Sequence, residues 1–108
     1  MDMVIKRFEI YFVNLDPTLG SKIKKSRPCV VISPDEVNRS LNTVIIAPLT
    51  STIKKYPTRI ECIVANKPGS VALDQLRTVD KQRLGKKIGV LDSDTAERVL
   101  EILRALFA

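Results

Sequence analysis

Two short segments of this chain carry residue types that handle phosphate groups. One is a basic, turn-rich loop at residues 20–28, GSKIKKSRP, and the other is PLTS at residues 48–51; each borders an apolar run. Guanidinium, ammonium and hydroxyl groups in such loops can bind phosphate oxygens. The 108-residue chain contains no histidine. The side chain whose ordinary pKa lies nearest neutrality is therefore absent, and any acid–base chemistry must use other groups.

The positive charge of the chain is concentrated in three segments. Lysine and arginine total 18 against 12 acidic residues, for a net charge of +6 and a pI of about 9.6. Ten of the 18 fall within residues 22–27, 54–55 and 81–87. If these segments meet at one end of the fold, they form a basic rim that attracts a polyanion. The plainer alternative is a domain that is basic without using its charge.

Length and composition predict a single domain over residues 1–108. An apolar content of 44% is enough for one core without disulfides or metal. Cys29 and Cys62 lie in apolar runs, where free thiols act as small hydrophobic side chains more often than as nucleophiles. We expect a reduced, cytoplasmic protein, because no apolar run approaches the ~18 residues of a membrane span and the N-terminus lacks a secretory signal.

Hydrophobic periodicity predicts mainly β structure. Residues 29–32 and 43–48 are continuous apolar runs, as in strands buried on both faces, whereas residues 58–64 alternate as a half-exposed strand does. A turn is expected at residues 67–69. Further strands are expected at residues 9–14, 70–73, 76–79 and 88–91. The connection from residue 15 to 27 is long, which is typical of functional or mobile loops.

Two helices are expected. Ser33 and Pro34 predict the cap and first position of a short helix that ends near Ser40. From Asp94, which is expected to cap a second helix, the apolar period becomes helical. The face expected to cover the sheet consists of Ala96, Val99, Leu100, Leu103, Leu106 and Phe107. Ile102 lies off this stripe, which hints at a second contact surface such as a subunit interface.

The order of motifs along the chain resembles the MazF/PemK family of toxins. The resemblance rests on residues 7–10, LDPT at 15–18, the basic loop 20–28, PLTS at 48–51 and VALDQLRTVD at 71–80. It extends over nearly the whole chain, which makes it more specific than any one short motif. It implies an α+β fold: a small antiparallel SH3-like β-barrel of the CcdB/PemK (MazF) type, with a short helix after the second strand and a C-terminal amphipathic helix.

The resemblance also implies an activity. Such a toxin is a homodimeric, metal-independent and sequence-specific endoribonuclease, an mRNA interferase that cleaves single-stranded RNA without a cofactor and is held inactive by an antitoxin. RNA supplies its own nucleophile, the 2′-hydroxyl, so the protein needs only to align it, stabilise the charge at phosphorus and protonate the leaving oxygen. This chain departs from the family in two places. Phe8 stands where many members have Gly, and Lys22 where Glu is frequent.

Arg27 and Thr50 are the catalytic residues that this resemblance implies. A guanidinium can hold two phosphate oxygens at once, and a threonine hydroxyl can bond a phosphate oxygen or the 2′-hydroxyl. The plainer roles are an arginine packed on the sheet and a strand-end threonine bonded to the backbone. The general base stays open, because Arg27 keeps its proton. Lys24 or Lys25 would serve only if neighbouring cations lowered its pKa.

Six further residues are expected to bind substrate. Gln75 and Arg77 match family positions that face RNA, where an amide reads a base edge and an arginine holds phosphate. Without the resemblance, both would be assigned to the polar face of an ordinary strand. The expected substrate-binding residues are Ser21, Lys25, Ser51, Gln75, Arg77 and Arg83, with Lys54, Lys55 and Tyr56 completing the rim. No metal site is expected, because the nearest carboxylate pair, Asp92 and Asp94, reads as a helix start.

Two other functions remain open at this point. One is a CcdB-like poison that binds a topoisomerase (gyrase) through protein contacts on the same barrel. The other is a non-catalytic nucleic-acid-binding regulator that uses the basic rim alone. Only the nuclease needs Arg27 and Thr50 in one cleft. Its antitoxin is expected to be an acidic, partly disordered segment, because complementary charge would both speed binding and block RNA.

Overall fold

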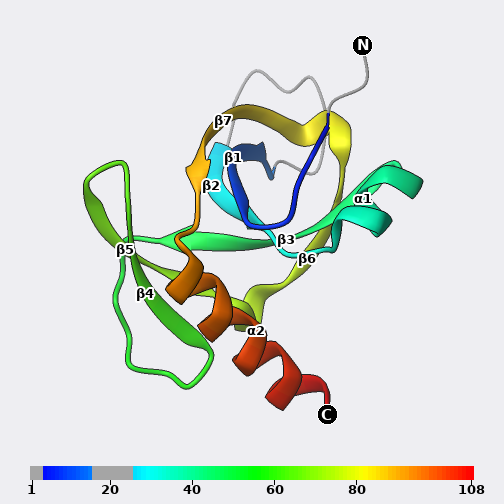
Figure 1. Ribbon diagram of the computed structural model, residues 1–108. Coiled ribbons are helices and arrows are strands. Elements are labelled where there is room, and N and C mark those ends of the chain that lie inside the picture. The colour runs from blue at the N-terminus through cyan, green and yellow to red at the C-terminus, as the bar shows by residue number, and fades with distance from the viewer. Residues whose placement is uncertain (1–3, 16–25) are drawn as a thin grey trace.

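The computed structural model describes residues 4–15 and 26–108 (Figure 1). Two α-helices lie within these residues, α1 (Asp35–Ser40) and α2 (Ser93–Phe107), together with two 3-10 turns, η1 (Leu73–Gln75) and η2 (Lys81–Arg83). The strands are β1 (Glu9–Asn14), β2 (Ser26–Val31), β3 (Thr43–Thr50), β4 (Arg59–Val64), β5 (Lys67–Ala72), β6 (Arg77–Asp80) and β7 (Leu84–Val90). The fold is mainly β, with a short helix after the second strand and a C-terminal helix, as predicted.

The strands form one antiparallel, curved sheet that branches at β3. The order is β4-β5-β3-β2-β1-β7, and β6 also pairs with β3. The first half of β3 pairs with β6, from Thr43 to Ile46, whereas its end pairs with β5, at Leu49 and Thr50. Thr50 therefore lies where the β4-β5 hairpin joins the main sheet (Figure 1).

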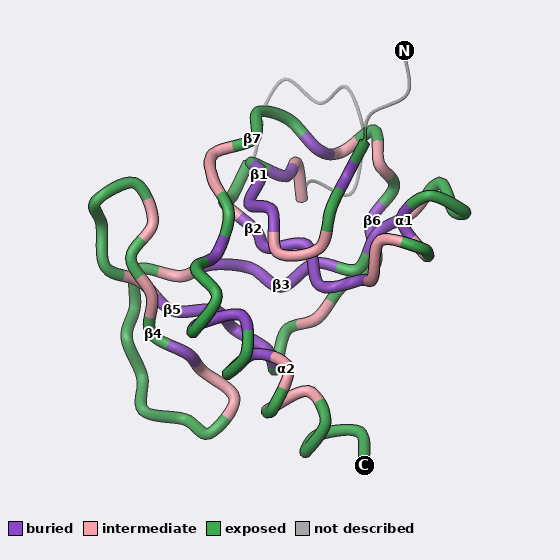
Figure 2. The backbone as a smooth tube through the Cα atoms, viewed as in Figure 1, coloured by how far each residue is buried: buried purple, intermediate pink, exposed green. Residues whose placement is uncertain are grey.

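Apolar side chains pack on both faces of the central strands. The core on the side of α2, here the α2-side core, contains Ile10, Val30, Ile32, Ala47, Leu49, Ile60, Val71, Leu73, Leu91 and Val99. The core on the opposite face, here the α2-distal core, contains Ile5, Tyr11, Val13, Cys29, Val31, Val44, Ile46, Val79 and Leu84. Figure 2 shows β3 buried along most of its length, and β2 is buried over its second half. The prediction of burial on both faces is confirmed for residues 29–32, whereas Ile45 within residues 43–48 is exposed.

The cap of α2 differs from the prediction. Asp92, not Asp94, occupies the N-cap position. Its carboxylate accepts hydrogen bonds from the hydroxyl of Thr95 at 2.6 Å and from the backbone amide of Thr95 at 3.0 Å, and these bonds lower the pKa of Asp92. The sequence offers two aspartates two residues apart, and pattern alone favoured the wrong one.

The contact face of α2 is also shifted. Ile102, predicted to lie off the packed stripe, contacts the α2-side core together with Leu103. Leu106 and Phe107, predicted to be packed, are exposed near the end of the helix (Figure 2). The apolar side chains of α2 are packed only along the part of the helix that contacts β4 and η1.

Ser33 does not cap α1. Pro34 occupies the N-cap position, and no side chain caps the helix. The buried Ser33 hydroxyl instead donates to Oδ1 of Asn38 and accepts from the backbone amide of Ile45 at 3.0 Å. The amide group of Asn38 donates to the carbonyl of Ser33 at 3.0 Å. The serine therefore ties α1 to β3.

The turn predicted at residues 67–69 lies two residues earlier. Ala65 and Asn66 have φ values of 52° and 63°, and Val64 pairs with Lys67 across them. Two left-handed residues are the requirement of a tight hairpin turn with the twist of its strands. Pro68 is tolerated inside β5, because β3 pairs only with residues 70–71 of that strand.

Phe8 has a left-handed backbone, with φ of 72°. The conformation is fixed on both sides, because its amide donates to the carbonyl of Val31 at 2.7 Å and its carbonyl accepts from the amide of Leu91 at 3.0 Å. A side-chain-bearing residue costs about 1–2 kcal/mol in this region. The Phe8 ring, which packs on the α2-side core, partly offsets that cost. The left-handed backbone explains why many members of the family that this chain resembles carry glycine at the position of Phe8.

We expect Phe8→Gly to be more stable than Phe8→Ala by about 1 kcal/mol. Both variants lose the packed ring, but only glycine relieves the left-handed strain. Urea unfolding of the two variants measures the difference directly. An alanine variant as stable as the glycine variant would contradict the strain at this position.

Candidate phosphate-binding site

The ends of three adjacent strands bring the candidate residues together. Arg27, at the start of β2, pairs with Val13 near the end of β1. Further along β2, Cys29 pairs with Pro48 of β3. The β2-β3 pairing ends at that pair, so Arg27 precedes it by two residues on β2 and Thr50 follows it by two residues on β3. Antiparallel order therefore places the start of β2 beside the end of β3.

Arg27 and Thr50 project from the same face of the sheet. Side chains alternate along a strand, and directly paired residues share a face. Arg27 pairs with Val13 and Thr50 is four residues from Ile46, and both of these apolar residues belong to the α2-distal core. Both candidates thus project from the side of the sheet that carries the α2-distal core, but neither belongs to the core itself. The two residues share a face of the sheet, which is less than the common cleft that the nuclease needs, and their catalytic role stays a prediction.

Arg77 reaches the same face from β6. It pairs with Ile46 of β3. Burial raises the pKa of the Cys29 thiol to about 11, against the opposing positive charges of Arg27 and Arg77. Both guanidinium groups therefore lie within electrostatic reach of one sulfur atom. The thiol stays protonated at neutral pH, so Cys29 is a small apolar core residue rather than a nucleophile.

Thr50 is held by the backbone on two sides. Its Oγ1 accepts a hydrogen bond from the amide of Thr52 at 3.1 Å, which leaves its O–H as a donor. β5 passes so close that a Cβ on Gly69 would lie 3.0 Å from the Thr50 carbonyl oxygen. The strand-end role expected of an ordinary threonine is therefore present, and it is compatible with a bond from the same hydroxyl to phosphate.

Only some of the other predicted binding residues can be placed relative to this face. Ser51 is exposed directly after Thr50, and Gln75 is exposed at the end of η1. Nη1 of Arg83 donates to the carbonyl of Asn14 at 3.2 Å, which places Arg83 at the end of β1, next to the start of β2. The basic-loop candidates lie outside the described residues: Ser21, Lys22, Lys24 and Lys25.

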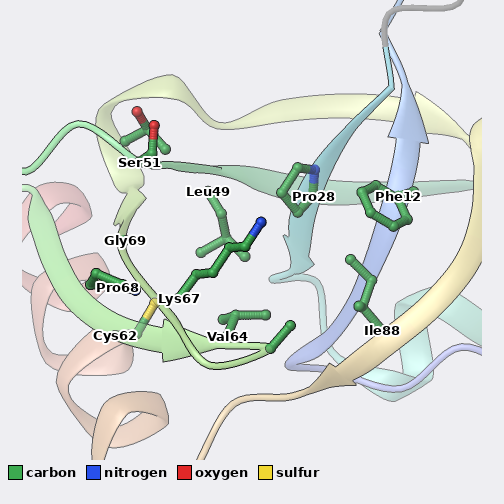
Figure 3. Close-up of a pocket in the computed structure, with 12 residues that line it drawn as sticks. Phe12, Pro28, Leu49, Ser51, Cys62, Val64, Lys67, Pro68, Gly69 and Ile88 are labelled. Atoms are coloured by element: carbon green, nitrogen blue, oxygen red, sulfur yellow. The ribbon is translucent and has the colours of Figure 1, made fainter.

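An apolar groove of about 280 Å³ borders Thr50 and Ser51 on the side of the α2-side core. Figure 3 shows the side chain of Lys67 extending across it. Its apolar walls are Phe12, Pro28, Leu49, Cys62, Val64 and Ile88. These residues come from five different strands, so sequence spacing gave no sign of the groove.

Ser70 lies directly opposite Thr50 and is fully buried. Its hydroxyl has no hydrogen-bond partner among the residues that the structure describes. A buried hydroxyl without a partner costs about 1–3 kcal/mol. The sequence showed only a serine in an apolar run, and its lack of a partner depends on the neighbouring strands.

We expect Ser70→Ala to raise the free energy of unfolding by about 1 kcal/mol, because it removes an unpaired buried polar group. The matched control is Ser33→Ala, which removes a buried serine hydroxyl that bonds Asn38 and Ile45 and should destabilise the protein by about 1–3 kcal/mol. Urea unfolding measures both. A loss of stability in Ser70→Ala would show that its hydroxyl is bonded in solution.

Glu9 is a buried carboxylate with a structural role. It accepts hydrogen bonds from the amide of Lys6 at 2.6 Å and the hydroxyl of Tyr11 at 2.9 Å, and it forms an ion pair with Lys87. Burial alone would raise the pKa of Glu9, but these three donors outweigh it and lower the pKa. Glu9 lies at the opposite end of β1 from the partner of Arg27. It is therefore no candidate for the general base.

Among residues 4–15 and 26–108, no three side chains of His, Cys, Asp or Glu gather closely enough to hold a metal ion. Neither α1 nor α2 has the length and apolar character needed to cross a lipid bilayer.

The chain is similar to proteins of one family. The family described as PemK-like, MazF-like toxin of type II toxin-antitoxin system matches residues 6–107. Endoribonuclease EndoA of Bacillus subtilis (strain 168) is 40% identical over 113 residues, which cover 98% of this chain and 97% of the relative. The crystal structure of MazF from Deinococcus radiodurans has a TM-score of 0.79 at 25% identity and 98% coverage of both chains. An endoribonuclease in complex with its cognate antitoxin, from Mycobacterial species, has a TM-score of 0.81 at 22% identity, covering 95% of this chain and 94% of that one.

Proposed function

We propose that this chain, which belongs to the PemK-like, MazF-like toxin family of type II toxin-antitoxin systems, is a sequence-specific, metal-independent endoribonuclease for single-stranded RNA. The observation that carries the proposal is the placement of Arg27 and Thr50 on one face of the sheet, the face from which Arg77 of β6 also projects. The name of the 40% identical relative, an endoribonuclease, supports the same activity.

In the proposed reaction the RNA 2′-hydroxyl attacks the adjacent phosphorus. A 2′-oxygen to phosphorus bond forms, the bond to the 5′-oxygen breaks, and the products are a 2′,3′-cyclic phosphate and a 5′-hydroxyl. Arg27 holds two non-bridging oxygens and offsets the charge that develops on them. The O–H of Thr50 donates to one of these oxygens or orients the 2′-hydroxyl.

The proton transfers are assigned to no side chain. Arg27 keeps its proton, Glu9 is engaged in the fold, and Lys24 and Lys25 lie outside the described residues. We propose that strong electrostatic stabilisation with a positioned hydroxyl supports a slow, selective reaction.

The proposed substrate contacts surround this pair. Arg77 and Arg83 bind phosphates on either side of the cleaved bond, and Gln75 reads a base edge. Ser51 extends the hydroxyl donors beside Thr50. The basic loop adds Ser21 and Lys25, whose part in binding rests on the family resemblance.

The proposed protein partners are a second copy of the chain and an acidic antitoxin. The mycobacterial endoribonuclease that shares this fold was solved with its cognate antitoxin. The net charge of +6 favours an acidic partner, which would cover the positive face and exclude RNA from it. Such a toxin acts on RNA in the cytoplasm.

Chelation tests the metal-independent reaction. We expect the purified protein to cleave a long single-stranded RNA in excess EDTA at the same rate as without it, and to leave 2′,3′-cyclic phosphate ends. End mapping and periodate sensitivity of the products check both points. Activity that EDTA removes and a divalent cation restores would contradict the mechanism, and an absence of cleavage under either condition would contradict the function.

A further inference from the structure

Tyr56 is an exposed aromatic side chain held in a fixed position. It lies in the β3-β4 connection, and 49% of its surface is exposed. The amide of Arg59 donates to the Tyr56 carbonyl at 3.1 Å, so the chain turns back at this point. The turn places Cζ of Arg59 5.4 Å from the centroid of the Tyr56 ring. The Tyr56 ring therefore stacks on the guanidinium of Arg59, which supports it.

Arg59, on which the ring rests, is itself held by hydrogen bonds. Nε and Nη2 of Arg59 donate to the two carboxylate oxygens of Asp74 at 2.7 and 3.1 Å, and the Thr58 hydroxyl donates to the same carboxylate at 3.0 Å. Only 10% of the Arg59 side chain is exposed. The hydrogen bonds from Arg59 lower the pKa of Asp74 to about 2, so the pair stays charged at neutral pH. A paired, forked guanidinium fixes the plane on which the Tyr56 ring rests.

The support also lies on the face of the candidate catalytic residues. Arg59 pairs with Ala72, and Ser70, two residues earlier on β5, pairs with Thr50. The side chains of Arg59 and Thr50 therefore leave the sheet on one side. They are separated by two strand spacings, about 10 Å, and two residues, about 7 Å. Asp74 is followed directly by Gln75 in η1, so the same ion pair anchors the segment that carries Gln75.

Exposed cations accompany the ring. Nζ of Lys54 lies 5.9 Å from its centroid, and Lys54 and Lys55 are both exposed. Single-stranded nucleic acid is bound by such combinations, in which an aromatic face stacks a base and nearby cations hold the phosphates. Arg59 is paired with Asp74, whereas Lys54 forms no ion pair within residues 4–15 and 26–108 and can exchange the ring for a phosphate.

We infer that Tyr56 forms a stacking subsite for one unpaired base of the RNA, on a nucleotide near the cleaved bond but not at it, with Lys54 and Lys55 on the flanking phosphates. The inference rests on the proposed function for the identity of the polymer. Stacking tolerates any base, so this subsite contributes affinity and register, and base identity is read elsewhere.

The test uses Tyr56→Leu, Tyr56→Phe and an RNA with a 2′-deoxy nucleotide at the cleaved position, which binds but cannot react. We expect Tyr56→Leu to weaken binding about tenfold and Tyr56→Phe to bind like the wild type, because phenylalanine keeps the ring. Phe107→Leu, which alters an exposed aromatic at the end of α2, is the matched control and should not change binding. Circular dichroism and thermal unfolding confirm that each variant is folded.

Abasic substitutions along the same RNA then locate the stacked base. At one position near the cleaved bond, removing the base should weaken binding to the wild type about tenfold and leave binding to Tyr56→Leu unchanged. Equal sensitivity of the two proteins at every position would overturn the subsite. The subsite would also be overturned if Tyr56→Leu weakened the binding of an acidic peptide but not the binding of RNA.

The outcomes also separate the subsite from the proposed function. A wild type that cleaves RNA, with Tyr56→Leu binding normally, overturns the subsite alone. A wild type that fails to cleave natural RNA but shows ring-dependent binding at one position supports the subsite and contradicts the nuclease.

Discussion

Replacing Arg27 with alanine is expected to lower the rate of RNA cleavage by about a hundred- to a thousandfold, the cost of removing one pre-positioned donor to transition-state charge. Arg27 lies at the start of β2, on the same face of the sheet as Thr50, and it is exposed to solvent. It forms no ion pair with any residue that the structure describes, so its charge is available to a phosphate.

Arg27→Lys separates geometry from charge. A lysine keeps the positive charge but cannot hold two phosphate oxygens in one plane, so we expect it to recover only part of the lost rate. The matched control is Arg39→Ala, which removes an equal charge from exposed α1, beyond the opposite end of β2. Its activity should stay close to that of the wild type.

Measurements of kcat and KM, with binding to the 2′-deoxy RNA, distinguish catalysis from attraction. A catalytic Arg27 predicts a fall in kcat larger than the loss of affinity, because the guanidinium acts most strongly on charge that develops in the transition state. Thermal unfolding should be unchanged, since the side chain is exposed. An Arg27→Ala protein that binds weakly but cleaves at the wild-type kcat would assign Arg27 to binding alone.

The central strands could be predicted because burial on both faces leaves a local signature. The continuous apolar run of β2 sends Val30 to one core and Cys29 and Val31 to the other, and the sequence indicated this without any knowledge of neighbours. The common face of Arg27 and Thr50 required more, namely the register that pairs β2 with β3. The resemblance named the two residues, and only the strand pairing shows that they share a face of the sheet.

Features that depend on distant pairing could not be predicted. The support of Tyr56 joins Arg59 to Asp74 across a hairpin, and the partnerless hydroxyl of Ser70 depends on strands from either side. Local alternatives caused other errors. Asp94 has the pattern of a cap for α2 although Asp92 is the cap, and Ser33 has the pattern of a cap but bonds across to β3 instead.

Thr50→Val is expected to lower the cleavage rate by about ten- to a hundredfold, because it removes one hydrogen bond to a charged group, worth about 1.5–3 kcal/mol, while keeping the volume and branching of the side chain. Thr50→Ser keeps the hydroxyl and should retain most of the activity. The control Thr52→Val alters the exposed neighbour but preserves its backbone amide, the donor to Thr50.

Combining Thr50→Val with Arg27→Ala tests whether the two residues serve one phosphate. If both contact the oxygens of the same transition state, the double variant loses much less than the product of the two single losses. Rates from single-turnover cleavage of one short RNA give the coupling directly. Losses that multiply would show that the hydroxyl and the guanidinium act independently, and a fully active Thr50→Val would leave Thr50 with only its bond to the Thr52 amide.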